Sequence, residues 1–221
     1  LNDCLEIYEP EMVRWFFVSS RPNTEFAISF DLDVLKNYED FDKCEKIYFG
    51  EEKVSEKTEA KQKRIYELSC VSEVPKKKPF QPSFRHLTNV LQINDMDIDK
   101  TVESYGVKDE RIRVRALCAK NWIQKYAPEE FKYSLKKDIG KVEERFIPIL
   151  KEVVKILDKE LTDKELHEEF YSLINENDLD NKEFFTLMYN LLIGKDKGPQ
   201  LASFILTIGK DRVKKLLSAA F

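Results

Sequence analysis

The chain has few of the residues that interrupt helices and form tight turns. Six Gly and eight Pro stand among 221 residues, whereas charged residues make up 35% of the sequence. A turn-dense β-protein needs more Gly and Pro, while long amphipathic helices carry much charge on their solvent faces. The 42% of hydrophobic residues is enough to bury a core. We therefore expect a mainly α protein with the fold of an irregular multi-helix bundle.

The sequence has few residues that could form a metal site or a disulfide. The four cysteines, Cys4, Cys44, Cys70 and Cys118, include no CxxC pair, and the chain has only two histidines. A zinc site is therefore not expected. We favour four reduced thiols in a cytoplasmic protein, because disulfides are rare in that compartment.

Long apolar runs and a secretory leader are also missing. The longest apolar runs, such as 203–208, are far shorter than the ~20 residues that span a bilayer, so no membrane partner is expected. The chain begins at Leu1, without Met and without the basic and apolar regions of a signal peptide. This beginning indicates a cut through a longer polypeptide.

Catalytic motifs are scarce. The sequence has no Gly-rich phosphate loop, no His-x-x-His or Lys-x-Ser-Lys nucleotide motif, and no convincing Ser/His/Asp set. Asp31 and Asp33 could suggest metal or acid–base chemistry, but carboxylates are also favoured in the first turn of a helix by its dipole, and we prefer that interpretation. The chain alone is expected to have no catalytic residues, to bind no metal and to hold no cofactor.

Apolar residues recur at helical spacing along most of the chain. We expect about ten helices. The candidate segments number eleven: 10–20, 31–48, 55–70, 83–91, 97–106, 110–126, 139–157, 162–174, 184–193, 199–209 and 211–219. Phe26 to Phe30 alternate like a strand or an extended segment. Pro148 either kinks its helix or marks the true beginning. The helices should form two packed parts, residues 1–108 and 109–221.

Local charge is more informative than the net charge of -4. Segment 109–141 holds nine Lys and Arg against five carboxylates, a net of +4, and segment 195–215 holds six against two, again +4. Between them, segment 158–184 holds three Lys against ten carboxylates, a net of -7. Two basic zones flanking an acidic one would let one side of the protein face phosphates. The alternative interpretation is that these charges lie on ordinary helix faces exposed to solvent, which would give the same counts.

Aromatic residues lie within the first basic zone. Trp122 and Tyr126 stand one helical turn apart, beside Lys120 and Lys125. Aromatic faces bind the unstacked bases of RNA loops, so this pattern favours the interpretation that the segment binds RNA. A Trp at helical spacing is also a common core residue, and on composition both interpretations stay open.

Two further groups of polar residues suit an anion. Arg85 and His86 fall in the first turn of a helix and could lie near a backbone phosphate, or could form a structural pair. Lys195 and Lys197 precede a helix N-terminus, whose free N–H groups suit an anion. An ordinary helix connection with surface lysines is an equal alternative for this loop.

Several sequence blocks, in order, resemble one family. They are YEPEMVRWFF (8–17), RPNTEFAISFDLDVLK (21–36), EKIYFG (45–50), IYELS (65–69), PFQPSFRHLT (79–88), GPQL (198–201) and IGK (208–210). Together they resemble the region that follows the catalytic domain in class I lysyl-tRNA synthetases of the archaeal type. Segment 158–184 resembles it least. Gln200 departs from the Arg expected there, which removes a charge-based role for this position.

The resemblance implies a fold and a function. It implies a stem-contact and connecting helical region at 1–108 and an α-helix-cage anticodon-binding domain at 109–221. The partners would be tRNA(Lys) and the parent enzyme's own catalytic domain, which ligates lysine to the tRNA with ATP and magnesium. This chain would be the recognition part of that ligase, inactive alone.

The resemblance, charge and aromatic placement together select candidate tRNA-binding residues. They are Arg14, Arg21, Arg85, His86, Lys120, Trp122, Tyr126, Lys195, Lys197 and Arg212. Two alternatives remain at this point. The chain could be a helical protein-interaction module that docks through its acidic segment, or the equivalent region of a glutamyl-tRNA synthetase.

Overall fold

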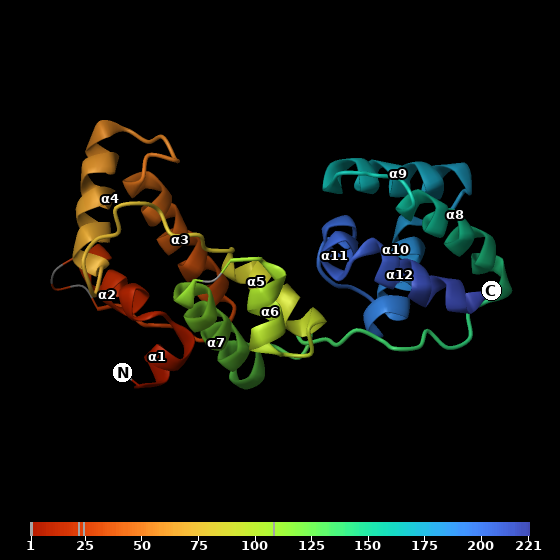
Figure 1. The fold of residues 1–221 in the computed structure, drawn as a ribbon, viewed down its shortest axis with the longest axis horizontal. Helices are drawn as coiled ribbons and strands as arrows, with labels where there is room; N and C mark the ends of the chain where they lie inside the picture. The colour runs from red at the N-terminus through yellow and green to blue at the C-terminus, as the bar shows by residue number, and fades with distance from the viewer. Residues whose placement is uncertain (1, 22, 24, 108) are drawn as a thin grey trace. The chain divides into compact units, whose positions relative to one another are not determined.

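The computed structural model describes residues 2–21, 23, 25–107 and 109–221, and over these residues the chain is helical with no strand. It divides into two compact units, Leu1–Lys132 and Tyr133–Phe221, each with its own helices (Figure 1). The prediction of a mainly α multi-helix fold is therefore confirmed. Residues 26–30 are extended but pair with no other strand among the described residues.

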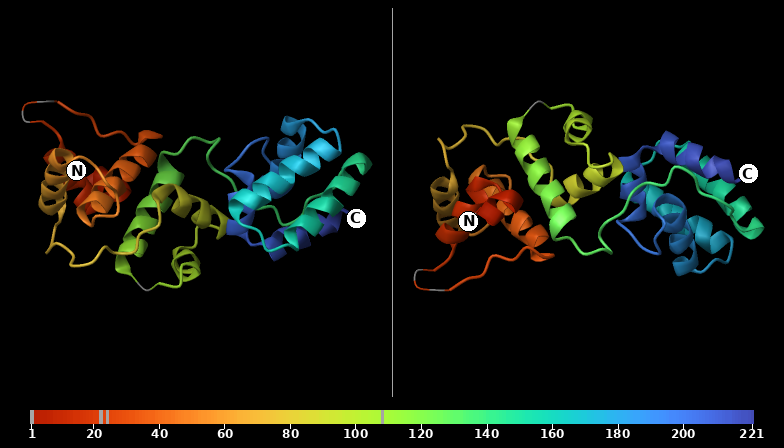
Figure 2. Two further views of the ribbon diagram at one scale, coloured as in Figure 1. Left: turned by 90° about the horizontal axis from the view of Figure 1, so that it is seen from above. Right: turned by 90° about the horizontal axis from the view of Figure 1, so that it is seen from below.

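Over its described residues, unit 1, the first compact unit, contains seven helices. These are α1 (Asn2–Ile7), α2 (Pro10–Ser19), α3 (Asp33–Tyr48), α4 (Glu56–Ser69), α5 (Phe84–Ile93), α6 (Ile98–Ser104) and α7 (Glu110–Lys125). Helix α4 packs against α2 and α3, while α7 packs against α1, α5 and α6. Figure 2 shows this arrangement of unit 1 from two further sides.

Unit 2, the second compact unit, follows an extended segment that begins at Tyr133. Its helices are the short 3-10 helix η1 (Glu144–Phe146), then α8 (Ile147–Leu157), α9 (Asp163–Glu176), α10 (Asn181–Ile193), α11 (Leu201–Ile208), α12 (Lys210–Leu217) and the 3-10 helix η2 (Ser218–Ala220). Helix α9 packs against α8, α10 and α11, and α12 packs against α8, α10 and α11. Each helix thereby buries its apolar side within the unit.

Helix boundaries follow from local side-chain chemistry. The Ser83 hydroxyl accepts a hydrogen bond from the His86 N–H at the start of α5. Thr162 and Glu165 form the reciprocal capping box of α9, which satisfies two N–H groups of its first turn. Pro148 stands in the first turn of α8, where its missing N–H costs nothing, so it marks the true beginning of that helix.

The helix α7 belongs to unit 1, although the sequence division at 108/109 assigned it to the second part. Its Trp122 is fully buried and packs on Phe84 of α5, with ring centroids 5.9 Å apart. Tyr38 of α3 stacks on the same Phe84 ring at 3.8 Å. The compact units therefore divide after Lys132, because the apolar side of α7 is covered by α1, α5 and α6.

A buried ionic network joins the elements of unit 1. Arg115 of α7 has no exposed surface and binds Glu9 at 2.9 Å, Asp42 at 2.8 Å and the Pro82 carbonyl at 3.1 Å. Burial alone lowers the pKa of Arg115, but the two carboxylates raise it above its ordinary value. Burial raises the pKa of Glu9 and of Asp42, against the opposing effect of the guanidinium. The network fixes α7 to the start of α2, to α3 and to the chain just before α5.

Candidate nucleic-acid interface

The structure brings Lys136, from the last part of the first basic zone, next to the second basic zone in unit 2. The extended segment after Tyr133 crosses the end of α10, where the Lys136 N–H donates to the Leu192 carbonyl at 2.8 Å. Gly194 ends α10 in the left-handed conformation, and a Cβ at that position would lie 3.9 Å from the Lys136 side chain. Lys195 and Lys197 follow directly. We call Lys136, Lys195 and Lys197 the lysine surface of unit 2.

The loop that carries Lys195 and Lys197 is held in place by α10. Asn190 donates to the Asp196 carboxylate at 3.0 Å, and the Tyr189 hydroxyl donates to the Pro199 carbonyl. Gly198 lies so close to the Tyr189 ring that an added Cβ would come within 2.9 Å of it. The lysines are therefore presented from a fixed backbone, in which the close approach at Gly198 excludes a larger residue.

The start of α11 adds a second anion-binding feature to the lysine surface. Gln200 precedes α11, and its side chain makes no capping hydrogen bond. The first N–H groups of a helix have no partner within it, and the positive end of the helix dipole lies there. Backbone donors and lysine ammonium groups at one place suit phosphate or a base carbonyl.

The two aromatic residues predicted to bind RNA, Trp122 and Tyr126, differ in how far they are exposed. Trp122 is 0% exposed, and its indole N–H donates to the Phe30 carbonyl at 3.0 Å. A ring with no exposed surface offers no face to a base, so the structure gives Trp122 a core role. Tyr126, in contrast, is exposed at the end of α7 and packs on Phe30 at 5.0 Å. Lys120 is half-buried on the same helix.

The predicted arginines of unit 1 lie on separate helices. Arg14 is exposed on α2 and donates to the Cys70 carbonyl at 2.8 Å, and Arg21 is exposed just beyond the end of that helix. Arg85 is exposed on α5 and paired with Glu39 at 3.1 Å. Its neighbour His86 lies at the surface, but its imidazole is partly enclosed, and this partial burial lowers the pKa of the ring below its ordinary value.

Arg212 lies apart from the lysine surface of unit 2. It lines a shallow pocket of about 340 Å³ together with Asp158, Glu160 and Asp211, whose carboxylates neighbour Lys210 and Lys214. Lys214 pairs with Asp158 and with Asp211 at 2.9 Å each. Acidic and basic groups balance in this pocket, which makes it a weaker place for a phosphate than the lysine surface.

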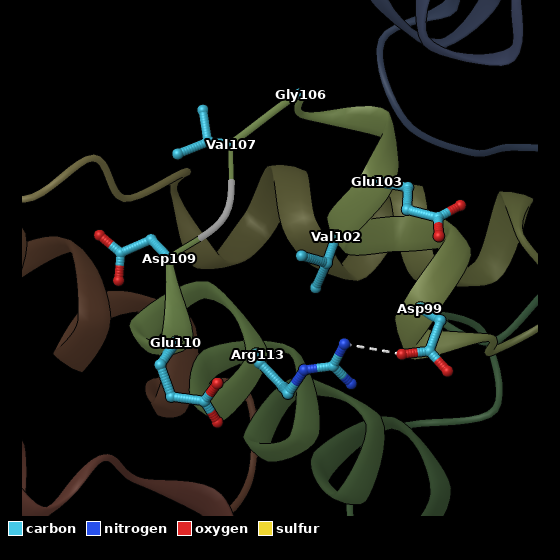
Figure 3. A pocket seen from close by; sticks show the side chains of 8 residues that line it. All are labelled: Asp99, Val102, Glu103, Gly106, Val107, Asp109, Glu110 and Arg113. Carbon is cyan, nitrogen blue, oxygen red and sulfur yellow. Dashed lines mark ion pairs between the residues drawn. The ribbon is translucent and has the colours of Figure 1, made fainter.

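A second pocket, of about 610 Å³, lies between α6 and α7 in unit 1 (Figure 3). Arg113 points toward Asp99 and pairs with it at 2.7 Å, while Glu103, Asp109 and Glu110 also line the pocket. Four carboxylates against one guanidinium repel phosphate. The described residues contain no group of three or more His, Cys, Asp or Glu arranged to hold a metal. This pocket is therefore excluded from the candidate RNA interface.

Three further predictions from the sequence can be compared with the structure: the role of Asp31, the state of the cysteines and the absence of a membrane span. The Asp31 carboxylate accepts the Asp33 N–H at 3.0 Å, and this bond, with that from Ser29, lowers the pKa of Asp31 and fits a role at the start of α3. The four cysteines are free thiols in the structure. Among the described residues, no helix has the length and apolar content that crossing a bilayer requires.

Sequence reasoning missed Lys136 as a member of the interface. Lys136 was counted in the first basic zone, but its segment has no helical period that would place it. The hydrogen bond to the Leu192 carbonyl, 56 positions further along the chain, brings it to the Lys195 loop. Such a long-range backbone interaction leaves no local pattern in the sequence.

Two family models match the chain. The model described as tRNA synthetases class I (K) matches residues 1–72, and the model described as anticodon binding domain matches residues 120–221. Residues 73–119 lie between the two matches. The anticodon match begins within α7 and includes the whole of unit 2.

Curated relatives align with nearly the whole chain. Proteins named lysine–tRNA ligase are 42% identical in Borreliella burgdorferi and 43% identical in Treponema pallidum, with 99% of this chain aligned in both cases. The archaeal protein of that name from Thermococcus kodakarensis is 33% identical over 98% of the chain. The alignments cover 43–44% of these relatives, so the chain spans less than half of their length. These names do not support a glutamyl enzyme or a protein-interaction module.

Proposed function

We propose that the chain belongs to the class I (K) tRNA synthetases, carries their anticodon-binding domain and is the tRNA-recognition region of a lysine–tRNA ligase. The parent protein would join lysine to tRNA(Lys) with ATP and magnesium, in the cytoplasm. That chemistry would belong to the part of the relatives that this chain does not span. The chain's own share is to bind and orient the tRNA.

In this proposal, the two parts of the chain have different roles in tRNA binding. Residues 1–108 form a stem-contact and connecting region, and residues 109–221 form the anticodon-binding cage, although its first helix, α7, packs within unit 1. The candidate phosphate contacts of the first region are Arg14, Arg21 and Arg85, all of which are exposed. In the second region, Lys120 lies on α7, Tyr126 directly follows that helix, and Arg212 lies on α12.

The observation that carries the proposal is the lysine surface of unit 2 inside the anticodon-domain match. Lys136 lies beside Gly194, and Lys195 and Lys197 follow in the loop that leads to the uncapped start of α11. Positive charge attracts the phosphates of an RNA loop, and backbone N–H groups can bind its base edges. The chain is acidic overall, so binding depends on this local concentration of positive charge rather than on net charge.

Salt-dependent binding of the 221-residue chain to a tRNA(Lys) transcript tests the proposal. The variants K136A, K195A and K197A should each weaken binding, and removing one phosphate-binding lysine should reduce the slope of log K against log salt by roughly 0.7–0.9. Lys182 provides a matched control, because it is exposed in the first turn of α10, at the opposite end of that helix from Gly194. K182A should leave affinity and slope nearly unchanged. Equal effects of all four variants would show that binding is not localised at the lysine surface.

A further inference from the structure

Three aromatic rings of unit 1 gather at the surface between the two family-model matches. Tyr105, at the end of α6, packs against Phe80 with ring centroids 6.2 Å apart and against His86 at 5.9 Å. Phe80 is 49% exposed, and His86 lies at the surface on the first turn of α5. Partial burial lowers the pKa of His86, which favours the uncharged form of its imidazole. We call these three rings the aromatic platform.

The loop that presents Phe80 is anchored on both sides. Lys78 pairs with Glu51 before it, and Gln81 donates to the Glu9 carboxylate at 3.0 Å after it. The next carbonyl, of Pro82, accepts from the buried Arg115 at 3.1 Å. The backbone on either side of Phe80 is thus tied to the core of unit 1, yet the ring itself faces solvent. Such an exposed aromatic ring on a fixed backbone is a feature of binding sites.

The charge around the platform is positive. Segment 73–86 holds Lys76, Lys77, Lys78 and Arg85 against a single carboxylate, Glu73. Lys78 and Arg85 are neutralised by Glu51 and Glu39. Lys76 and Lys77 are exposed and make no ion pair among the described residues. Two available ammonium groups therefore stand three and four positions before the exposed Phe80 ring.

We propose that the aromatic platform binds an unpaired base of the tRNA by stacking on Phe80, while Lys76 and Lys77 bind the adjoining phosphates. An exposed ring with neighbouring lysines is the combination by which proteins hold single-stranded nucleotides without reading their sequence. The inference rests on the proposed function for its partner, RNA. It assigns a binding site to residues 73–119, which neither family model matches.

Substitutions of Phe80 test whether a ring is required. F80A should weaken binding of the tRNA(Lys) transcript roughly 5- to 150-fold, the range for removal of one base–aromatic stack. F80Y keeps the ring and should bind like the native chain, whereas F80L keeps an apolar side chain without a ring and should bind like F80A. Native affinity in F80A, or in F80L, would overturn the stacking site. L117A is the matched control, since Leu117 is equally exposed at 49% on the outer side of α7; it should bind normally.

The lysines give an independent test. K76A and K77A should each reduce the salt slope by roughly 0.7–0.9, whereas K78A removes the same charge from a residue already paired with Glu51 and should reduce it less. Equal slopes for K76A, K77A and the native chain would overturn the phosphate contacts. Far-UV circular dichroism of each variant checks that the helices are retained.

Failure of this inference can be told from failure of the proposed function. If the platform is right, F80A weakens binding to tRNA(Lys) and to the same transcript with a replaced anticodon by the same factor, because stacking is tolerant of sequence. If only the platform is wrong, F80A binds normally while K195A and K197A still weaken binding. If no native transcript binds at low salt, the proposed function fails and the inference fails with it.

Discussion

At the residue scale, Arg115 and Arg113 of α7 show how burial changes the contribution of an ion pair to stability. Arg115 is fully buried and holds Glu9, Asp42 and the Pro82 carbonyl, whereas Arg113 makes one exposed pair with Asp99. R115A would leave two buried carboxylates without their partner, so we expect it to lower the free energy of unfolding by about 3–5 kcal/mol. Urea denaturation of the native and variant chains measures the difference.

R113A is the matched control for that experiment. An exposed ion pair is screened by water and salt, and its removal should cost no more than ~1 kcal/mol. A destabilisation in R115A as small as that in R113A would contradict the structural role given to the buried network. The same result would remove one of the anchors proposed to hold the loop of Phe80.

His86 should make stability depend on pH in a defined direction. Its pKa in the folded protein is lowered by burial, so the unfolded chain takes up a proton at a higher pH than the folded chain does. The stabilisation is complete above the unfolded pKa and is lost as the pH falls through the lowered folded value. H86Q lacks this titration. The stability of the native chain relative to H86Q should therefore fall as the pH is reduced below about 6.5; a difference that is constant with pH would contradict it.

Single residues also show what sequence patterns leave undecided. Trp122 and Tyr126 share one turn of α7 and look equivalent in the sequence, yet one is core and the other is exposed. The difference depends on residues far away in the chain. Phe84 packs on the Trp122 ring and the Phe30 carbonyl accepts from its indole N–H, whereas Tyr126 contacts the Phe30 ring and stays 36% exposed. Phe80 was similarly part of a family-like sequence block, but its exposure follows from anchors at Glu51, Glu9 and Arg115.

At the scale of helices, the starts predicted at Ser83 and Thr162 and the stop predicted at Gly194 were confirmed, whereas the start of α10 was predicted at 184 and lies at Asn181, where Asp180 caps the helix. Ser83, the Thr162–Glu165 box and Gly194 act within a few residues of the helix end that they determine. The helix α1 (Asn2–Ile7) was missed, because it is only six residues long and its sequence carries no capping box. Its place depends on packing against α7, which no local pattern reveals.

The capping box of α9 gives a prediction at this scale. Thr162 accepts the Glu165 N–H, and Glu165 in turn accepts from Thr162, which lowers the pKa of that carboxyl. T162A should reduce the free energy of unfolding by about 1 kcal/mol, because the Glu165 N–H in the first turn loses the Thr162 hydroxyl as its acceptor. S172A, within the same helix and exposed, serves as the control and should change stability little. Thermal denaturation of both variants distinguishes a cap from an ordinary surface hydrogen bond.

At the scale of the whole molecule, charge is segregated while the net charge is slightly negative. Helix α9 and its flanking residues carry most of the acidic segment 158–184, and the lysine surface lies in the loop after α10 and the segment after Tyr133. Composition could predict the basic and acidic zones. It could not predict that Lys136 meets the Lys195 loop, since that meeting depends on the fold of unit 2.

The most direct test of anticodon recognition compares two tRNA(Lys) transcripts that differ only in the anticodon. Fluorescence anisotropy at one fixed salt concentration would measure the affinity of the 221-residue chain for the native transcript and for one whose anticodon is replaced. Recognition of the anticodon predicts tighter binding to the native transcript by at least about tenfold, which corresponds to ~1.4 kcal/mol. Equal affinity for both transcripts would contradict the central claim.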